Sequence, residues 1–530
     1  MLVASTIFSS PFSWTNEIFS SAVRSINTGR YTLVRRAATA SEIERHTALQ
    51  RATALEQKSR QLRQEGSYGQ AESAAEEALN IRRELLGRQD YLIAVSLNGL
   101  ALIYQEQEQY EKAEAFFRES LQMSVDLFGD RHPEVASGLN NLGLLYYEQY
   151  LYEGAEEFLE ESLSIRLEKL DERSIEVGQS FGNLALLRSD QGLYSDSEEL
   201  FLKAIDILQD HYPEEHIVIT GVLRNMAGLY SEMGRYKESE ETYTQVLENF
   251  RQSLGSFHPN VAETLNKMGE LYREQGRIEE AEPLYREALN ISQELLGRRN
   301  LLVATVLNNL ALLNEEKGLY SAAEAQHLES LSIREEILGE SHFLYAQSLS
   351  NLGALYHTKG QYRKAESFHK QALEIRREVL GDRHDDVALT LNNLAELYRV
   401  QGRYVEVEPL LLDAISINEE KYGRNYNRIS THLNNLGLLY QALGRLDEAE
   451  EAYRESLAIL KNQLNDLPPN AALTINSLGA ISHMRKHYGE AERFYRRAIQ
   501  LLGEKLGERH PTTANAINNL AVLYKEVGRD

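Results

Sequence analysis

The sequence predicts an all-α fold made of stacked antiparallel helix pairs. One motif returns every 42 residues, without insertion or deletion, over eleven occurrences. Within each period, two stretches place apolar residues at helical spacing, and glycines follow them. Because each repeat then meets the same neighbours as the one before it, the repeats are expected to stack in line as an α-solenoid.

The motif Asn-Asn-Leu at 140–142 sets the register of the repeats. We call its first residue the marker and count other positions from it. A glycine stands at position +10 in nine of twelve copies, an aromatic residue usually stands at +12, and a glutamate stands at +16 in all eleven complete repeats. The marker residues are Glu56, Asn98, Asn140, Gly182, Arg224, Asn266, Asn308, Ser350, Asn392, Asn434, Asn476 and Asn518.

Each period contains two predicted helices. The first has its apolar stripe from Leu391 to Tyr398 in the clearest copy, and Gly402 is expected to end it in a left-handed conformation. The second has its stripe from Ala281 to Leu296, and a glycine follows it as well. The next turn often contains His-Pro, where proline suits the first position of a helix.

Composition excludes several classes of function. Of 530 residues, 42% are hydrophobic and 26% charged, the net charge is −24, and there is no cysteine. The negative charge disfavours nucleic acid and anionic lipid as partners, and no apolar run is long enough to span a bilayer. Nucleotide-binding loops and nucleophile motifs are missing. We therefore expect a cytoplasmic protein with no catalytic residue, cofactor or metal; import into an organelle is the alternative if the source is eukaryotic.

The order of the landmarks resembles the tetratricopeptide repeat. The motifs are Leu-Asn-Asn-Leu-Ala at 391–395, Gly-x-Tyr-x-x-Ala-Glu at 360–366 and Leu-Gly-x-x-His-Pro at 254–259. This 42-residue version is similar to the repeats of kinesin light chains, and the likeness covers about residues 50–530. It implies a right-handed superhelix over 41–530, with about eleven helix pairs and a final lone helix. Residues 1–50 lack the heptads of a kinesin light chain, so a motor role is not expected.

The resemblance places the first helices on a concave groove that binds extended protein segments. The marker asparagines would line this groove and hold a peptide backbone through their amides. The alternative is that they hydrogen-bond between neighbouring helices and fix the stacking. The predicted groove asparagines are Asn98, Asn140, Asn266, Asn308, Asn392, Asn434, Asn476 and Asn518.

Charge changes along two further positions. Position +8 is acidic from Glu106 to Glu316 but is Thr358, Val400, Ala442 and Met484 in the next four repeats. Position +7 gains Arg273, His357, Arg399 and His483. These four cationic or titratable residues predict that an acidic or aromatic-acidic segment docks within 345–530. The alternative is that they are ordinary solvated helix ends.

Two recurring residue types are expected to be structural. Histidines occur once in many repeats, as at His132 and His258, so neighbours are too far apart to share a metal and are expected to cap the next helix. The glutamate at +16, such as Glu282, is expected to interact with the helix dipole or a neighbouring helix rather than to act in catalysis.

The two ends leave several alternatives open. Residues 1–40 are rich in Ser, Thr and Arg, which fits a disordered tail or a transit peptide. The final helix would cap the stack, associate with another chain through Leu520 and Tyr524, or mark a fragment. We expect a peptide-binding adaptor; the alternatives are a scaffold subunit of a larger complex and the regulatory half of a signalling protein.

Overall fold

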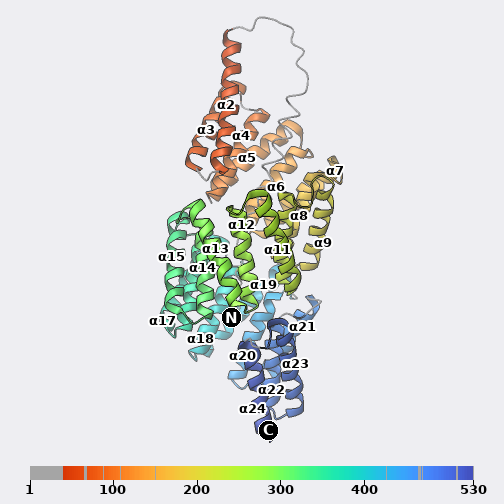
Figure 1. Cartoon of the computed structure of the whole chain (residues 1–530), viewed down its shortest axis with the longest axis vertical. Helices are drawn as coiled ribbons and strands as arrows, with labels where there is room; N and C mark the ends of the chain where they lie inside the picture. The colour runs from red at the N-terminus through yellow and green to blue at the C-terminus, as the bar shows by residue number, and fades with distance from the viewer. Residues whose placement is uncertain are drawn as a thin grey trace. The chain divides into compact units, whose positions relative to one another are not determined.

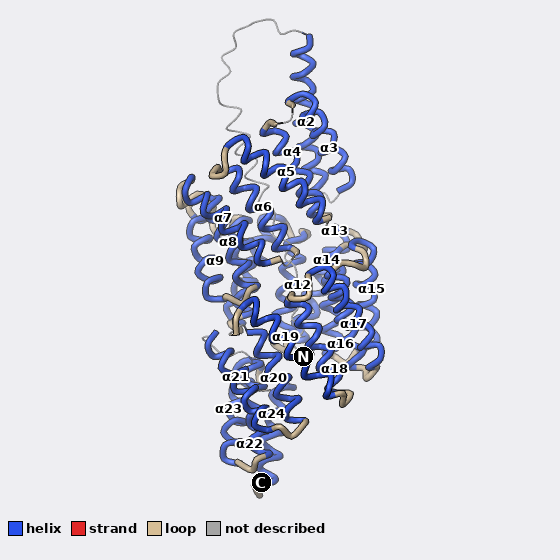
Figure 2. Tube along the Cα trace, turned by 180° about the vertical axis from the view of Figure 1, so that it is seen from behind, coloured by secondary structure: helices blue, strands red, loops and turns tan. Residues whose placement is uncertain are grey.

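A computed structural model describes residues 40–528, except 65–67, 88, 108, 150, 425–426, 464–466, 468 and 509–510. The described residues form helices joined by short loops, without a strand among them (Figures 1 and 2). The predicted all-α solenoid of helix pairs is confirmed. The tail or transit peptide proposed for 1–40 lies, apart from residue 40, outside the described residues.

The first helix of each repeat runs from seven residues before the marker to eight after it, apart from the longer α2. The first helices are α2 (Ala40–Gln64), α4 (Tyr91–Glu106), α6 (Pro133–Glu148), α8 (Ile175–Asp190), α10 (Ile217–Glu232), α12 (Pro259–Glu274), α14 (Leu301–Glu316), α16 (Phe343–Thr358), α18 (Asp385–Val400), α20 (Asn427–Ala442), α22 (Pro469–Met484) and α24 (Pro511–Glu526).

The second helix packs antiparallel against the first helix of its own repeat. The second helices are α3 (Tyr68–Leu86), α5 (Tyr110–Phe128), α7 (Tyr152–Lys169), α9 (Tyr194–Gln209), α11 (Tyr236–Leu254), α13 (Ile278–Leu296), α15 (Tyr320–Leu338), α17 (Tyr362–Leu380), α19 (Tyr404–Tyr422), α21 (Leu446–Gln463) and α23 (Tyr488–Leu506). In the described part of the chain, eleven pairs therefore precede α24.

The helices divide into two compact units, and the boundary between them along the chain falls between Val222 and Leu223 in α10. Each unit has a core built from the predicted apolar stripes. In the first unit, Leu97, Leu100 and Phe117 are at most 1% exposed. In the second unit, Leu394 and Leu411 pack in one cluster of buried residues. That residues 41–530 form one continuous solenoid domain stays a prediction.

Glycine ends the helices as predicted. At position +10 the φ angle is +73° at Gly402 and +74° at Gly192, a conformation that glycine adopts without steric cost. Around Gly192, its own N–H donates to the carbonyl of Ser189 (2.9 Å) and the N–H of Leu193 donates to that of Arg188 (2.8 Å). This is the Schellman arrangement, which supplies donors to the last carbonyls of the helix. Lys486 occupies the same position with φ +64°, so one repeat holds a lysine where glycine is favoured.

Candidate functional site

The first helices of successive repeats contact one another, and we call the surface they form the first-helix face. Such contacts join α4 with α2 and α6 with α8 in the first unit, and α12 with α14 and each first helix from α16 to α24 with the next one in the second. All predicted groove residues lie on these helices. The face is therefore the place to look for a ligand site.

Most of the marker asparagines are buried between first helices. The exposed fraction is 7% at Asn98 and at Asn140, 2% at Asn266, 4% at Asn308 and 6% at Asn392. The Oδ1 of each accepts a hydrogen bond from an asparagine at position +1 of the next repeat. These bonds join Asn141 to Asn98 (2.7 Å), Asn183 to Asn140 (2.9 Å), Asn309 to Asn266 (3.1 Å), Asn351 to Asn308 (2.7 Å) and Asn435 to Asn392 (2.8 Å).

These hydrogen bonds join neighbouring repeats, and we call each such bond a rung. They are the contacts expected if the asparagines fix the stacking of the helices. They occupy the amide oxygen that a peptide would have met, and burial removes these five side chains from solvent. Towards the carboxyl end the asparagines become more accessible: Asn434 and Asn476 are half-buried and Asn518 is exposed. Asn434 accepts from Thr474 (3.3 Å) and Asn476 from Asn519 (3.1 Å). A peptide-binding role for the asparagines stays a prediction.

Positions +7 and +8 are also joined across repeats. A residue at +7 donates to the residue at +8 of the next repeat, 43 residues further on. The pairs are Arg63 with Glu106 (3.2 Å), Tyr147 with Asp190 (2.8 Å), Ser231 with Glu274 (3.4 Å), Arg273 with Glu316 (2.7 Å) and His483 with Glu526 (2.7 Å). The early acidic run therefore includes carboxylates that hold neighbouring helices together.

This pairing changes the interpretation of Arg273. Its side chain is 12% exposed and its Nη1 lies 2.7 Å from Glu316 Oε1, so it is committed to the contact between α12 and α14. Glu274 beside it is a strongly perturbed acid: burial, together with nearby Glu270 and Glu232, raises the pKa of its carboxyl to about 8. Arg273 is thus positioned to link two helices rather than to stand open in the groove.

The other three predicted residues differ from one another. His357 on α16 is half-buried, and burial, followed by the nearby Arg399, lowers the pKa of its ring against the opposing influence of Glu396. Arg399 pairs with Glu396 on its own helix (Nη2 to Oε1, 2.7 Å). His483 donates to Glu526, whose pKa this hydrogen bond lowers. The four residues do not form one cluster; they occupy the same position on four different first helices, α12, α16, α18 and α22.

The repeats from α16 to α22 lose the acid at +8. Val400 is 42% exposed and Met484 is 53% exposed, and Ala442 between them is exposed as well. Arg273 faces Glu316 at position +8 of the next repeat. Arg399 is the equivalent residue three repeats later, and position +8 of the repeat that follows it is Ala442. We call Val400, Ala442 and Met484, with Arg399 beside them, the apolar strip. It is a part of the first-helix face with side chains exposed to solvent.

The residues expected to be structural have the predicted contacts. The Nδ1 of His132, His258 and His384 accepts from the backbone N–H two residues on, at 3.2 Å in each case, and so caps the next first helix. The glutamate at +16 accepts from a tyrosine on the first helix of the following repeat, as Tyr104 does towards Glu72 (2.8 Å) and Tyr272 towards Glu240 (2.9 Å). This confirms its interhelical role.

The sequence reasoning missed a buried arginine near the end of several second helices. Arg334 is 1% exposed, and its Nη1 donates to the carbonyl of Leu344 (2.9 Å) and to Ser348 Oγ (2.9 Å) on the next first helix. Arg166 makes the equivalent bond to Ser180 (2.7 Å), and burial lowers its pKa to about 10. A Ser or Thr fourteen residues after the arginine is the signal that reveals this contact.

Known proteins support the same architecture. The model of the tetratricopeptide repeat matches residues 50–125, 93–168, 134–210, 219–294, 262–336, 302–378, 386–462 and 470–530. No curated protein matches the chain. Within the described residues, no helix has the length and apolar character of a membrane span.

Solved structures that resemble the chain include other repeat proteins. A Rap protein in complex with competence and sporulation factor is 14% identical, with a TM-score of 0.51, over 71% of this chain and 100% of that one. BtubC (BKLC) from P. vanneervenii is 27% identical, with a TM-score of 0.35, over 43% and 91%. A putative kinesin light chain from Podosopora anserina is 21% identical, with a TM-score of 0.32, over 38% and 95%.

The repeat register, the helix pairs and the matched segments agree with one another. The prediction of tetratricopeptide repeats is confirmed, because the family model matches along most of the chain. The chain belongs to the tetratricopeptide repeat family.

Proposed function

We propose that this protein is a non-catalytic adaptor that binds a peptide segment of another protein on its first-helix face. Tetratricopeptide arrays support protein interaction and scaffold roles. The Rap protein whose fold is similar was solved with a competence and sporulation factor, which gives one example of a ligand held by such a fold. A scaffold subunit of a larger complex and a regulatory half of a signalling protein are the alternatives.

The apolar strip is the observation on which the proposed binding site rests. In other repeats, such as those of Glu106 and Glu316, position +8 carries an acid that is bonded to the preceding repeat. Val400, Ala442 and Met484 instead leave apolar surface exposed, although the sulfur of Met484 accepts from Gln441 (3.6 Å). Arg399 adds a cation beside that surface and forms a bidentate pair with Glu396 of its own helix (2.8 and 2.7 Å). A segment with an aromatic or aliphatic side chain next to an acidic one matches both properties.

The chain itself supplies a variant that tests this site. Ala442→Glu places an acid at the position that Glu316 occupies three repeats earlier, so that Arg399 gains the partner that Arg273 already has. We expect the variant to fold, because the Arg–Glu contact between first helices exists in the same register. It should remove binding of an acidic segment by occupying Arg399 and by adding negative charge. Ala442→Gln has a similar size without the charge and is the matched control.

The experiment uses an array of short peptides in which Asp or Glu neighbours Trp, Phe or Leu, with Lys-for-acid copies as controls. Fluorescence anisotropy then measures the affinity of the best peptides for the full chain. We expect about a tenfold or greater loss for Ala442→Glu and a smaller one for Ala442→Gln, with an affinity that weakens as salt is added. Equal binding by the two variants, or no preference for acidic peptides, would rule out the proposed site. Capture of folded partners alone would favour the scaffold alternative.

A further inference from the structure

Three successive second helices end in an exposed aliphatic residue. Position +29 is Leu295 in α13, Ile337 in α15 and Val379 in α17, with exposed fractions of 44%, 40% and 42%. Leu296, next to Leu295, is 38% exposed. The three helices follow one another within the second unit (Figures 1 and 2), and because the repeats share one register, their carboxyl-terminal ends form a row. We call Leu295, Leu296, Ile337 and Val379 the aliphatic edge.

The fold does not require an aliphatic residue at this position. Outside the edge, position +29 is aliphatic at Leu85 and Leu127 but polar in the remaining repeats, which have Lys169, His211, Ser253, Lys421, Gln463 and Lys505. Packing within the chain therefore does not account for the aliphatic residues at the ends of α13, α15 and α17. Adjacent apolar side chains that are exposed to solvent are typical of interaction sites.

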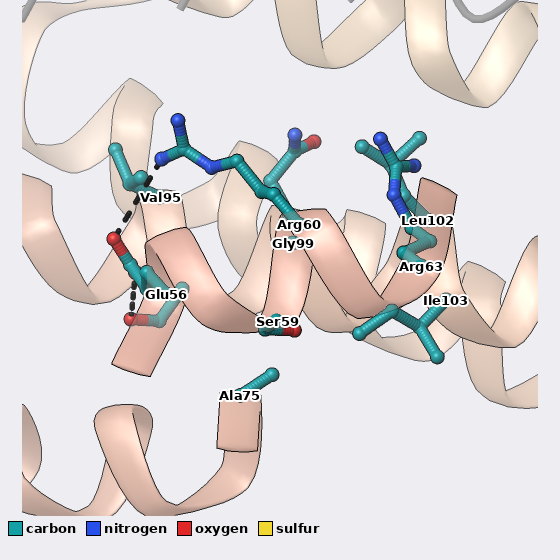
Figure 3. Close-up of a pocket in the computed structure, with 11 residues that line it drawn as sticks. Glu56, Ser59, Arg60, Arg63, Ala75, Val95, Gly99, Leu102 and Ile103 are labelled. Atoms are coloured by element: carbon teal, nitrogen blue, oxygen red, sulfur yellow. Dashed lines mark hydrogen bonds and ion pairs between the residues drawn. The ribbon is translucent and has the colours of Figure 1, made fainter. Parts of the chain in front are cut away.

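The preceding position, +28, carries an acid that an arginine holds in four repeats. The arginine stands at position +33 of one repeat and reaches the acid on the next second helix. These pairs are Arg131 with Glu168 (2.6 Å), Arg173 with Asp210, Arg299 with Glu336 (2.6 Å) and Arg383 with Glu420. A carboxylate beside an arginine is also found in the pocket between α2, α3 and α4, where Arg60 lies 3.8 Å from Glu56 (Figure 3).

Two of the three acids along the edge lack their arginine. Position +33 is Phe257 before Glu294 and Ser341 before Glu378. Both carboxylates are exposed, and neither forms a hydrogen bond or an ion pair with another residue that the structure describes. Phe257 is 55% exposed and adds apolar surface at the position that arginine has in other repeats. The edge therefore combines apolar side chains with negative charge.

The residues around the edge leave this negative charge in place. Arg298 after α13 and Glu340 after α15 are both exposed, and their opposite charges offset each other. Arg377, next to Glu378 in sequence, pairs instead with Asp382 (3.3 Å). A partner with cations beside its apolar side chains therefore complements the edge.

The spacing of the edge fits an α-helix. The axes of packed helices lie about 8–10 Å apart, so neighbouring repeats of the stack advance by about 10 Å. Seven residues of an α-helix rise about 10.5 Å and return the side chain to nearly the same face. A helix that lies across the edge thus places every seventh residue against Leu295, Ile337 and Val379 in turn. An extended strand covers the same distance in about three residues, which turns alternate contacts away from the edge.

We propose that the aliphatic edge binds an amphipathic α-helix of another protein, with aliphatic residues at every seventh position and Lys or Arg between them. The aliphatic residues contact the edge, and the cations reach Glu294 and Glu378. This site lies on second helices and takes a helical ligand, so it goes beyond the proposed peptide site on the first-helix face. With both surfaces, one chain would hold two partners.

Three variants test the edge. Ile337→Lys places a cation in its middle, and we expect it to fold because Lys169 and Lys421 stand at the same position. Leu127→Lys makes the same change in charge at this position of α5, where the leucine is 38% exposed, and is the matched control. Glu294→Gln combined with Glu378→Gln removes only the charge of two exposed side chains, so its folding is not at risk.

The probe is an alanine-based peptide of about 22 residues, long enough as a helix to cross three repeats. It has leucine at every seventh position and lysine three residues before and four residues after each leucine. One control peptide has glutamate in place of lysine. Another has its leucines five residues apart, which spreads them around the helix. Fluorescence anisotropy measures the affinity of each peptide for the full chain.

We expect the parent chain to bind the probe about tenfold more tightly than either control peptide, with an affinity that weakens as salt is added. Ile337→Lys should lose about tenfold or more, because it removes a central contact and repels the lysines. Leu127→Lys should match the parent chain. The double Gln variant should lose the preference for lysine over glutamate. Ala442→Glu, which tests the first-helix face, should bind the probe as the parent chain does.

Several results would overturn the proposal: no binding of the probe to the parent chain, equal affinities of Ile337→Lys and Leu127→Lys, or an unchanged preference for lysine in the double Gln variant. Sedimentation velocity of the parent chain and of Ile337→Lys tests the remaining occupant, a second copy of this chain. Self-association that Ile337→Lys removes would assign the edge to that second copy and would equally reject the helical partner.

Discussion

Glycine at position +3 determines how closely the two helices of a repeat approach. In α12, a Cβ added at Gly269 would lie 2.8 Å from Cε1 and 2.9 Å from Cδ1 of Tyr285, a ring that is 0% exposed. Ordinary contact begins near 3.4 Å, so the ring or the helix would have to move by about 0.6 Å. Gly269→Ala is therefore expected to strain the packing of α12 against α13.

The change in the free energy of unfolding caused by Gly269→Ala is the sum of two opposing effects. Overpacking a filled core costs about 1–3 kcal/mol, and replacing glycine by alanine inside a helix gains about 1 kcal/mol. Gly182→Ala in α8 is the matched control, because its added Cβ would meet atoms only at 3.9 Å. Since both substitutions gain the same helical propensity, the control should stabilise its helix by about 1 kcal/mol. The difference between the two isolates the overpacking, about 1–3 kcal/mol.

Hydrogen exchange measured by mass spectrometry suits this comparison, because each repeat of a solenoid is stabilised mainly by its neighbours. We expect amides of α12 and α13 to exchange faster in Gly269→Ala than those of α8 and α9 do in Gly182→Ala, each relative to the parent chain. A difference of 1.4 kcal/mol corresponds to a tenfold change in protection.

A second substitution provides the rescue. Adding Tyr285→Leu to Gly269→Ala recreates the pair formed by Ala395 and Leu411 at the same positions, both of which are buried. Protection of α12 should then return towards the parent value. Equal effects of Gly269→Ala and Gly182→Ala, or no recovery in the double variant, would refute the packing argument.

Two further predictions concern groups buried in the second unit. His369 is 2% exposed, and its burial, followed by the charges of Arg376 and His357, lowers the pKa of its ring to about 3. The same ring titrates near 6.5 in the unfolded chain. The free energy of unfolding should therefore fall as the pH drops below 6.5, by about 2 kcal/mol at pH 5. His369→Tyr copies the pairing of Gly437 with Tyr453 and should remove this loss of stability at low pH. The measurement is the change in the urea midpoint between pH 7 and pH 5. A pH dependence equal to that of the parent chain would contradict the prediction. Asn309→Ala removes the donor to the buried Asn266 and should lower protection of α12 and α14 by about 1–3 kcal/mol. Asn519→Ala, at a half-buried rung, should have a smaller effect, and equal losses would show that burial does not set the cost.

The sequence contained most of the fold because its signals are local or periodic. The glycines at +10, the histidine caps and the glutamate at +16 each depend on residues near in sequence or on one helix pair, and their contacts match the predictions. The site was less accessible from sequence. Whether Asn140 faces a ligand or the next helix, and whether Arg273 is open or bonded to Glu316, depends on which residue of one repeat meets which residue of the next. That register becomes visible only when the repeats are stacked.

The rungs explain why the repeat length does not vary. Both kinds of rung join a residue to one 43 positions further on, as Asn308 is joined to Asn351 and Arg273 to Glu316. Insertion of one residue between two such partners would separate them and leave buried amides and charges without partners, which costs more than the bond itself contributes. Polar contacts inside the stack therefore select the register, while the apolar stripes supply most of the burial.

The same argument predicts where ligands bind. A position where a rung is present has its polar atoms committed to a neighbouring helix and offers little to a partner. A position where a rung is absent leaves an exposed apolar side chain beside a cation, as at Val400 and Arg399. Restoring the rung should keep the stacking and abolish the binding. Stability and binding are thus expected to respond in opposite directions to Ala442→Glu, a response that a purely structural role of this position would not produce.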